Sequence, residues 1–356
     1  MLNYKETAIE RIIDKDDDIT IGEVNIKGVK SKVISYNNII GKINVGDIVT
    51  VNTTAMDLSL GSGGYHFVMN NKSIKERKNY GQGHIMKLRY TPYQLRTLVS
   101  EEQGSKFHEK INSFKSLDGL KVLVGSLHSM LAPTAAIIKF LKPNLKINYI
   151  MTDGGALPIK FSFIVKELKK KGIINNTITI GHAFGGDFEC VNIYTGLICA
   201  KEVLNSDIVI VTMGPGIVGT GTKYGFTGIE QGYILDGVNK LDGQGYIIPR
   251  ISFADKRTRH KGISHHTITV LNKIICSRTN LVLPKLSDDK NKFIKNQIKN
   301  TNILNKHNIL YRKGEEIKKA LEHFDLDVTT MGRYYDDDKD FFTSIGAVAS
   351  YVCDFF

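Results

Sequence analysis

From Leu120 to its C-terminus the chain repeats a unit in which a short apolar run is followed by a loop and then by an amphipathic helical segment. Near-continuous apolar strands separated by such helices are typical of a parallel sheet covered on both faces. We therefore predict an α/β fold with a mostly parallel, doubly wound, Rossmann-like sheet. A (β/α)8-type barrel is the alternative for this C-terminal part, because the number of units would also allow closure. The runs lie at residues 121–124, 147–151, 177–180, 207–211, 245–248, 280–283, 308–311 and 327–330.

The N-terminal part follows a different pattern. Between about Ile19 and Leu88, short segments alternate apolar and polar residues and are separated by turns such as Gly46-Asp47. Several short strands with regular turns predict a small β-barrel or a compact antiparallel sheet. Residues Pro92–His108 are expected to form a linking helix. The predicted domains are thus a β-rich, barrel-like domain with a helical linker over residues 1–115 and an α/β domain over residues 116–356.

Length and composition narrow the class of protein. The chain has 356 residues, which is enough for two domains, and no run of about eighteen uncharged apolar residues predicts a membrane span. Its amino terminus lacks the apolar centre of a signal peptide, so we expect a cytoplasmic protein. The four cysteines are widely spaced and form no C-x-x-C pair, which disfavours a disulfide framework or a structural zinc site.

The net charge of +12 raises the hypothesis of a nucleic-acid partner. Many of the positive charges, however, lie in patterns typical of surface helices, such as Lys166–Lys171. A run of charges is usually a solvated helix face. Nucleic acid therefore stays an alternative partner, and a small anionic ligand is favoured.

Parallel α/β folds bind ligands at the carboxyl ends of their strands, so functional side chains are expected in the loops that follow the strands. Asp153 lies just after the second run and is followed by two glycines, which let a ligand approach the backbone, although Asp-Gly-Gly is also common turn chemistry. His182 follows the third run and could act as an acid or a base. His128 follows the first run, in a Gly-Ser loop that could bind an anion or simply cap a helix.

The fourth run leads into a glycine-rich loop. Residues 214–219 match the G-x-G-x-x-G fingerprint of dinucleotide-binding proteins. The residues after Gly219 are too rich in glycine to begin a firm helix at once, so neither NAD nor FAD is expected. We interpret the segment as a loop that wraps a phosphate or carboxylate with N–H groups and hydroxyls, with a flexible lid as the alternative. The residues assigned to ligand binding are Gly214, Gly216, Gly219, Thr220, Gly221 and Thr222.

The loop after the fifth run, residues 250–266, holds the densest group of polar side chains in the chain. Arg257 and Arg259 carry planar guanidinium groups that suit phosphate or carboxylate. Asp255 could hold one of these arginines in place. A purely structural salt-bridge network would explain the arginines and the aspartate equally well, but it would not explain the three histidines of the same loop.

Those three histidines leave metal binding open, with a divalent ion as a possible cofactor. Adjacent histidines on a helix point about 100° apart and rarely bind the same ion, so His265 and His266 are not expected to act together. His260 with one of the two could do so. The identity of any metal ligand is unknown at this level.

Two further segments could contribute to the same site. An acidic run follows the last predicted strand, and such runs are usually solvated loops. If this run folds over the edge of the sheet, Arg333 and Asp336 could approach the ligand. In the N-terminal domain His66 follows a cluster of glycines, and because ligand pockets often lie between domains it could close the site.

Six segments are informative when they are taken together: Asn52–Ala55, Gly63–Val68, Thr152–Pro158, Gly216–Gly221, Arg250–Asp255 and Ser264–Thr267. They resemble a family of uncharacterised bacterial proteins of about this length, described as a domain of unknown function. The resemblance covers nearly the whole chain, and its block of Arg, Asp and His residues is fairly specific. It implies a soluble bacterial protein, and it brings no established activity and no assigned catalytic residues.

These residues predict an enzyme that binds a small anionic ligand, phosphorylated or nucleotide-like, at the carboxyl ends of parallel strands. The reaction would be a hydrolysis or a group transfer on a phosphorylated small molecule. His182 or His265 would act as acid or base, because imidazole titrates near neutral pH. Asp153 or Asp255 would orient that histidine or bind a divalent ion. The alternatives are a nucleic-acid-associated protein and a non-catalytic sensor or scaffold, and the sequence does not indicate an oligomeric state.

Overall fold

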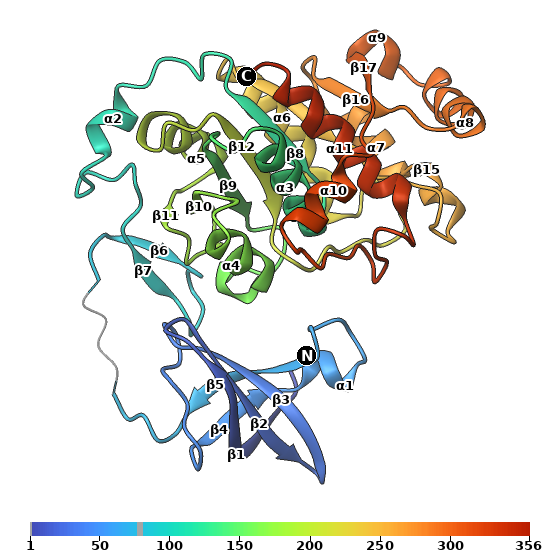
Figure 1. Ribbon diagram of the computed structural model, residues 1–356. Coiled ribbons are helices and arrows are strands. Elements are labelled where there is room, and N and C mark those ends of the chain that lie inside the picture. The colour runs from blue at the N-terminus through green and yellow to red at the C-terminus, as the bar shows by residue number, and fades with distance from the viewer. Residues whose placement is uncertain (1, 77–80) are drawn as a thin grey trace. The chain divides into compact units, whose positions relative to one another are not determined.

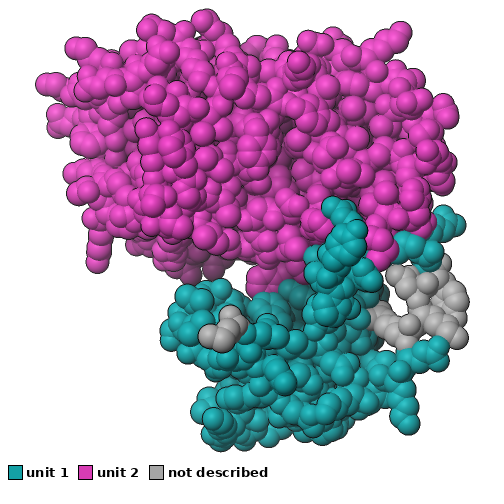
Figure 2. Space-filling view, turned by 180° about the vertical axis from the view of Figure 1, so that it is seen from behind, with its two compact units in different colours: residues 1–82, 88–96 teal, residues 83–87, 97–356 magenta. Residues whose placement is uncertain are grey.

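The computed structural model describes residues 2–76 and 81–356, and the chain forms two compact units, which Figure 1 traces and Figure 2 colours separately. The barrel unit comprises Met1–Gln82 and Leu88–Arg96. The α/β unit comprises Gly83–Lys87 and Thr97–Phe356. The boundary between the two units thus lies near residue 96, whereas the sequence suggested a domain boundary between residues 115 and 116.

The barrel unit is a closed barrel of five strands: β1 (Tyr4–Lys15), β2 (Ile19–Ile26), β3 (Val29–Tyr36), β4 (Ile48–Asn52) and β5 (Tyr65–Asn71). The strands pair in the order β1-β2-β3-β5-β4, and α1 (Thr54–Asp57) follows β4. Alternation decides which side chains face the centre, because successive residues of a strand point to opposite faces. In β4, Val49 and Val51 are fully buried and Thr50 between them is not. The barrel-like N-terminal part is therefore confirmed.

The segment between the barrel and the large sheet contains β6 (Ile85–Lys87), β7 (Leu95–Thr97) and α2 (His108–Asn112). The helix predicted over Pro92–His108 is wrong, because these residues form a short strand and turns before α2 begins. Val99 is buried, and the N–H of Ser100 donates to the carbonyl of Glu189 at 2.8 Å. A backbone group that bonds to a distant part of the chain cannot serve a local helix, so tertiary contacts override the helical pattern here.

The α/β unit is built on an eight-stranded sheet in which every pair of neighbours is parallel. Its strands are β8 (Lys121–Gly125), β9 (Ile147–Thr152), β10 (Asn176–Thr179), β11 (Phe188–Glu189), β12 (Ile208–Met213), β13 (Gln244–Ile248), β16 (Asn280–Pro284) and β17 (Asn308–Arg312). They pair in the order β11-β10-β9-β12-β8-β13-β16-β17. The sheet is open, with β11 and β17 at its edges. This confirms the doubly wound fold, and the alternative of a closed barrel for this part is wrong.

Every predicted run up to residue 312 forms a strand of this sheet, but the last run, 327–330, does not. Its Thr330 only bridges to Arg333 in a tight turn, and the short β11 occupies the opposite edge of the sheet instead. The run follows a left-handed residue, Asp325, and contains two polar threonines. A strand buried on both faces needs more continuous apolar character than that.

Helices cover both faces of the sheet (Figure 1). The first face carries η1 (His128–Met130), α3 (Leu131–Leu141), η2 (Ile159–Phe161), α4 (Phe163–Lys170), α10 (Ile317–His323) and α11 (Lys339–Cys353). The second carries α5 (Ile193–Ile198), η3 (Cys199–Val203), η4 (Thr227–Ile229), α6 (Glu230–Lys240), α7 (His265–Thr269), η6 (Val270–Ile274), α8 (Asp288–Lys299) and α9 (Ile303–Lys306). The central strands contribute to both cores: in β8, Leu123 packs into the first core, and Val122 and Val124 into the second.

The strand order creates a place where connections diverge. After β9 the chain moves to β10, toward one edge, and after the neighbouring β12 it moves to β13, toward the other edge. Loops that leave in opposite directions open a crevice at the carboxyl ends of the strands, which is where open α/β sheets bind ligands. Among the residues that the structure describes, none of the helices has the length and apolar character needed to cross a membrane.

Candidate functional site

Asp153 directly follows β9 and lies at the crevice. The sequence predicted this location, because Asp153 comes just after the second apolar run. Its Oδ2 atom accepts a hydrogen bond from the backbone N–H of His182 at 3.0 Å. The loops after β9 and β10 are thereby joined at the carboxyl ends of their strands. Two of the predicted catalytic residues are thus neighbours in space, although 29 positions separate them in the sequence.

Glu230, the first residue of α6, lies beside Asp153 and was not identified from the sequence. Its side chain is buried, and Oε1 accepts a hydrogen bond from the hydroxyl of Thr152 at 2.6 Å. Burial raises the pKa of Glu230 to about 7, the Thr152 hydrogen bond opposes that shift, and the nearby charge of Asp153 adds to it. A carboxyl group that is partly protonated near neutral pH can both donate and accept a proton. In the sequence, however, Glu230 reads as an ordinary acidic residue in the first turn of a helix.

The loop after β12 contacts the loop after β9 so closely that only glycine fits at the crossing. The N–H of Ala156 donates to the carbonyl of Pro215 at 2.8 Å. A Cβ at Gly155 would lie 2.3 Å from the carbonyl oxygen of Gly214, and a Cβ at Gly214 would lie 2.3 Å from that of Ala156. At this point the glycines allow two backbones to pack, which is a structural role for Gly214 in addition to any ligand.

Farther along, the same loop forms a small hairpin. Gly219 bridges to Phe226, and at the exposed tip the hydroxyls of Thr220 and Thr222 lie 2.9 Å apart. In dinucleotide-binding proteins a helix begins directly after the fingerprint. Here the helix α6 begins only at Glu230, after the hairpin. Residues 219–222 are exposed, and their role in ligand binding stays a prediction.

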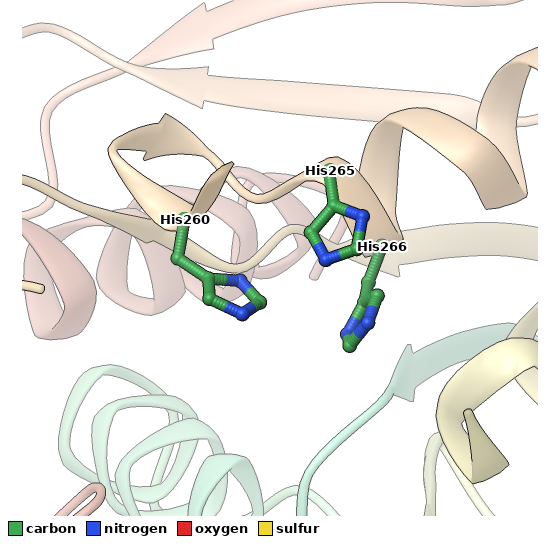
Figure 3. A group of neighbouring side chains, drawn as sticks. All are labelled: His260, His265 and His266. Carbon is green, nitrogen blue, oxygen red and sulfur yellow. The ribbon is translucent and has the colours of Figure 1, made fainter. Parts of the chain in front are cut away.

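Three histidines meet beside this hairpin. His260 lies in η5 (Thr258–His260), and His265 and His266 begin α7. One ring nitrogen from each histidine lies within 4.8 Å of the other two, and Figure 3 shows the three rings bordering one common space. The sequence suggested that adjacent histidines would point apart, but the short helix α7 and the turn before it bring both rings to the same side.

The surroundings of the three histidines hold them in place and keep them neutral. Ser264 caps α7, and its Oγ lies 2.8 Å from Nδ1 of His260. The ring of His266 stacks on Phe226 with centroids 3.9 Å apart. Burial lowers the pKa of His260 to about 3 and that of His266 to about 4. Burial also lowers the pKa of His265, so burial disfavours the charged form of all three imidazoles.

Arginines supply positive charge next to the histidines. Nη1 of the buried Arg250 lies 3.3 Å from Nδ1 of His260. The exposed Arg259 and the partly exposed Arg257 contribute to the lowering of the histidine pKa values through their charge. The positive potential that disfavours protonated histidine would also favour a bound anion.

Asp255 lies at the centre of a network of ion pairs. Its side chain is buried, and it accepts hydrogen bonds from Arg250 at 2.8 Å and from Arg257 at 2.8 Å and 3.0 Å. The hydrogen bonds from Arg257 hold the pKa of Asp255 well below its usual range, so the carboxylate is ionised. Asp255 is thus hydrogen-bonded to two arginines, which is one of the roles that the sequence suggested, and its role in orienting a histidine or binding a divalent ion stays a prediction.

The acidic segment near the C-terminus joins this network through one arginine and one aspartate. Arg333 lies 4.0 Å from Asp255 and 2.9 Å from Asp338. Asp338, which the sequence did not single out, is fully buried and also accepts a hydrogen bond from Ser252 at 2.8 Å. Asp336 lies apart from the network and pairs with lysines at the surface. Three arginines thus face two carboxylates, which leaves a formal excess of one positive charge.

His128 occupies a different part of the crevice. Its Nδ1 lies 3.0 Å from the carbonyl of Met213, and its Nε2 lies 2.6 Å from the hydroxyl of Ser162. Burial lowers the pKa of this histidine to about 4. Because both ring nitrogens have partners within the protein, a bound ligand could contact only the face or edge of the ring, unless one of these bonds were given up.

A pocket of about 360 Å³ lies beside His128. Most of its lining is apolar, and the loop after β12 forms one wall through Pro215, Gly216 and Ile217. Asp327 and Thr329 add polar groups from the segment that failed to form a strand. A pocket of this size at a topological switch point can hold the ring of a small ligand.

His66 lies on β5 in the barrel unit, where it is buried. Burial lowers its pKa, and the nearby Asp57 opposes that shift. Its role in closing the ligand site stays a prediction. Within the α/β unit, two groups of predicted residues come together, one with Asp153 and His182 and one with Asp255, Arg257, Arg259 and His265. The loop after β12 contacts the backbone after Asp153 at Gly214 and the ring of His266 at Gly219.

The comparisons with known proteins agree with the resemblance seen in the sequence. A comparison with curated proteins finds no match. A family model described as "Protein of unknown function (DUF3866)" matches residues 32–349, which is most of the chain and includes every group described above. The chain therefore belongs to this family of unknown function.

Proposed function

We propose that the protein is an enzyme that binds a small anionic ligand, phosphorylated or nucleotide-like, at the carboxyl ends of the parallel strands, and that it hydrolyses or transfers a group of that ligand. The observation that carries the proposal is the network of Arg250, Arg257 and Arg333, which exceeds its carboxylates by one charge and lies beside neutral histidines and Gly219. An uncompensated guanidinium at such an edge favours phosphate or carboxylate.

The loop after β12 supports a ligand that has both an apolar and an anionic end. Its Pro215–Ile217 segment lines the largely apolar pocket, and its Gly219 lies beside His266. A nucleotide-like molecule could place its ring in the pocket and its phosphate near the arginines. Arg257, whose side chain is 41% exposed, is the arginine of the network that is most available to such a ligand.

Glu230 is the best candidate for acid–base chemistry, because its pKa of about 7 allows both protonation states at working pH. Burial keeps that pKa high, and the charge of Asp153 adds to the effect. His182 and His265, which the sequence suggested for this role, remain candidates. Catalysis of hydrolysis or transfer would need such a group beside the bound anion.

Two rival functions remain, and each has its own signature. A nucleic-acid-associated protein would bind RNA or DNA with an affinity that falls steeply as salt increases. A sensor or scaffold would bind the small anion without converting it. The excess of charge in one local cluster of arginines favours the small ligand over an extended polyanion, which needs a basic surface stripe.

The proposal is tested by calorimetric titration of the full chain with AMP and with inorganic phosphate, and by assay for release or transfer of phosphate. Arg257→Gln should weaken binding by roughly ten- to a hundredfold, because a charge-assisted hydrogen bond is lost. Asp255 stays paired with Arg250 in this variant. Arg312→Gln is the matched control, since Arg312 pairs with Asp354 at the surface.

Equal affinity of Arg257→Gln and the wild type would reject the role of the arginine network. Binding of AMP without turnover of any phosphorylated compound would identify a sensor. Absence of binding to both probes, together with salt-dependent retention of RNA, would favour the nucleic-acid alternative.

A further inference from the structure

We propose that His260, His265 and His266 bind a divalent transition-metal ion of the zinc type through one ring nitrogen each, and that a fourth coordination position stays open for an anion or a water molecule. This inference goes beyond the proposed anionic ligand, because the three histidines could bind a metal whether or not AMP or phosphate binds. It concerns residues of two short elements, η5 and α7, that Figure 3 shows together.

The geometry of the three rings is close to that of a metal site. Their candidate ligand atoms lie within 4.8 Å of one another. Three nitrogens bound tetrahedrally to one zinc ion at the usual bond length would be about 3.4 Å apart. Small rotations of the side chains would close this difference, because the ring centroids are already only 4.9 Å apart for His260–His265 and 5.2 Å apart for His260–His266.

A buried nitrogen in this group lacks a partner. Among the residues that the structure describes, none forms a hydrogen bond with Nε2 of His265, although that atom is buried. A buried polar atom without a hydrogen-bond partner lowers the stability of the folded protein by about 1–3 kcal/mol, and such atoms are rare in proteins. A metal ion bound at this nitrogen would satisfy it.

The contacts behind the rings are those expected of metal ligands. Metal-binding histidines usually donate their second ring N–H to an oxygen, which fixes the orientation of the ring and the nitrogen that faces the metal. Ser264 Oγ, fully buried and 2.8 Å from Nδ1 of His260, is such an oxygen. The guanidinium of Arg250, which can only donate, lies 3.3 Å from the same nitrogen, so a free Nε2 at the ion requires that Nδ1 bond to Ser264 and not to Arg250. The stacking of His266 on Phe226 fixes a second ring.

The donor atoms select the kind of ion. Imidazole nitrogen suits zinc, copper, nickel and cobalt, whereas magnesium and calcium require oxygen ligands. The arginines nearby would oppose an isolated dication, since Arg250 lies 3.3 Å from His260. A hydroxide or phosphate at the fourth position would balance both the ion and the arginines. The structure leaves room for such an anion beside His266, because at position 219 there is a glycine without a side chain.

The test begins with the full chain stripped of metal by a chelator and then dialysed. Zinc titration followed by calorimetry should give one tight site per chain. The cobalt complex should show the intense visible absorption of a tetrahedral ion. His265→Ala should weaken zinc binding by at least about a hundredfold, since it removes a ligand directly and loss of a supporting contact alone costs ten- to a hundredfold. Nε2 of His265 forms no hydrogen bond with the residues that the structure describes, so the substitution removes none there. The variant should therefore keep the wild-type circular dichroism spectrum.

His323→Ala is the matched control, because His323 is exposed on α10 and packs against phenylalanine rings away from the three histidines. It should bind zinc as the wild type does. The proposal is overturned if the wild type binds no stoichiometric zinc, if His265→Ala binds it with unchanged affinity, or if the cobalt complex gives only the weak spectrum of an octahedral ion. The cobalt spectrum of the wild type decides the matter even if the alanine variant does not fold. Zinc binding without binding of AMP or phosphate would support this inference and reject the proposed function.

Discussion

Ser264 illustrates how a single residue can serve local structure and the site together. Its Oγ accepts a hydrogen bond from the N–H of His266 at 3.3 Å and thereby caps α7, and the same oxygen lies 2.8 Å from the ring of His260. At the residue scale, the arrangement of the candidate site depends on such shared contacts. Glu230 is a second case, because its position beside Thr152 and Asp153 makes its titration differ from that of a surface glutamate.

The raised pKa of Glu230 predicts a dependence of stability on pH. The folded value is about 7 and the ordinary value is 4.5, so between these pH values the folded state keeps a proton that the unfolded state has lost. Stability should therefore fall as pH rises through this window, by up to about 3 kcal/mol. Glu230→Gln should lack this contribution and gain stability relative to the wild type between pH 5 and pH 8, as measured by urea unfolding.

Glu322→Gln is a suitable control for that measurement, because Glu322 is 65% exposed and forms only a surface pair with Lys318. Its stability should follow the wild-type curve at each pH. Parallel stability curves for Glu230→Gln and the wild type would show that the pKa of Glu230 is not raised.

At the element scale, α11 shows how packing can reverse an intrinsic preference. This helix is buried along most of its length, and Gly346 contacts the backbone at Gly314. A Cβ at position 346 would lie 2.2 Å from the carbonyl oxygen of Gly314. Alanine normally stabilises a helix relative to glycine, but here it would force two backbone segments apart.

Gly346→Ala should therefore destabilise the protein by roughly 1–3 kcal/mol in denaturant unfolding. Gly237→Ala is the matched control within α6, because the nearest atom to its added Cβ would be 3.6 Å away, an ordinary contact with Tyr194. This control should stabilise by roughly 0.5–1 kcal/mol through helix propensity. If both variants moved stability in the same direction, the close approach at Gly346 would not exist.

At the scale of the whole molecule, the strand order matters more than any single loop. It places the loops after β9, β12 and β13 along the same edge of one sheet. The loop after β12 then connects the group around Asp153 with the group around His266. The net charge of the chain is +12, whereas the arginine network has an excess of only one positive charge. Most of the net charge therefore lies outside the candidate site.

This arrangement predicts where a ligand should protect the backbone from hydrogen exchange. Addition of zinc or AMP to the full chain should slow exchange in residues 214–228 and 250–266, because these loops contact the proposed sites. Strands β1–β5 of the barrel should exchange as before. Protection confined to the barrel strands would contradict the assignment of the site to the α/β unit.

Much of the fold could be predicted from the sequence, because a strand buried on both faces must be a continuous apolar run. The runs up to residue 312 formed strands for this reason. The helix expected over Pro92–His108 failed because Ser100 bonds to Glu189, a partner that local pattern cannot reveal. The loops that hold the site could also be predicted, since they follow strands.

The amino-acid sequence by itself determined the α/β class, the separate β-rich N-terminal part and the loops that hold the candidate site residues, because these follow from local periodicity and chain order. Only the tertiary structure decided which side chains meet. Thr152 and Glu230 are 78 positions apart, and Ser252 and Asp338 are 86 apart. Such contacts depend on strand order and on the packing of loops, and neither is encoded in the pattern of neighbouring residues. Even the adjacent His265 and His266 each place a ring nitrogen within 4.8 Å of one from His260, which the spacing of residues on a helix did not predict.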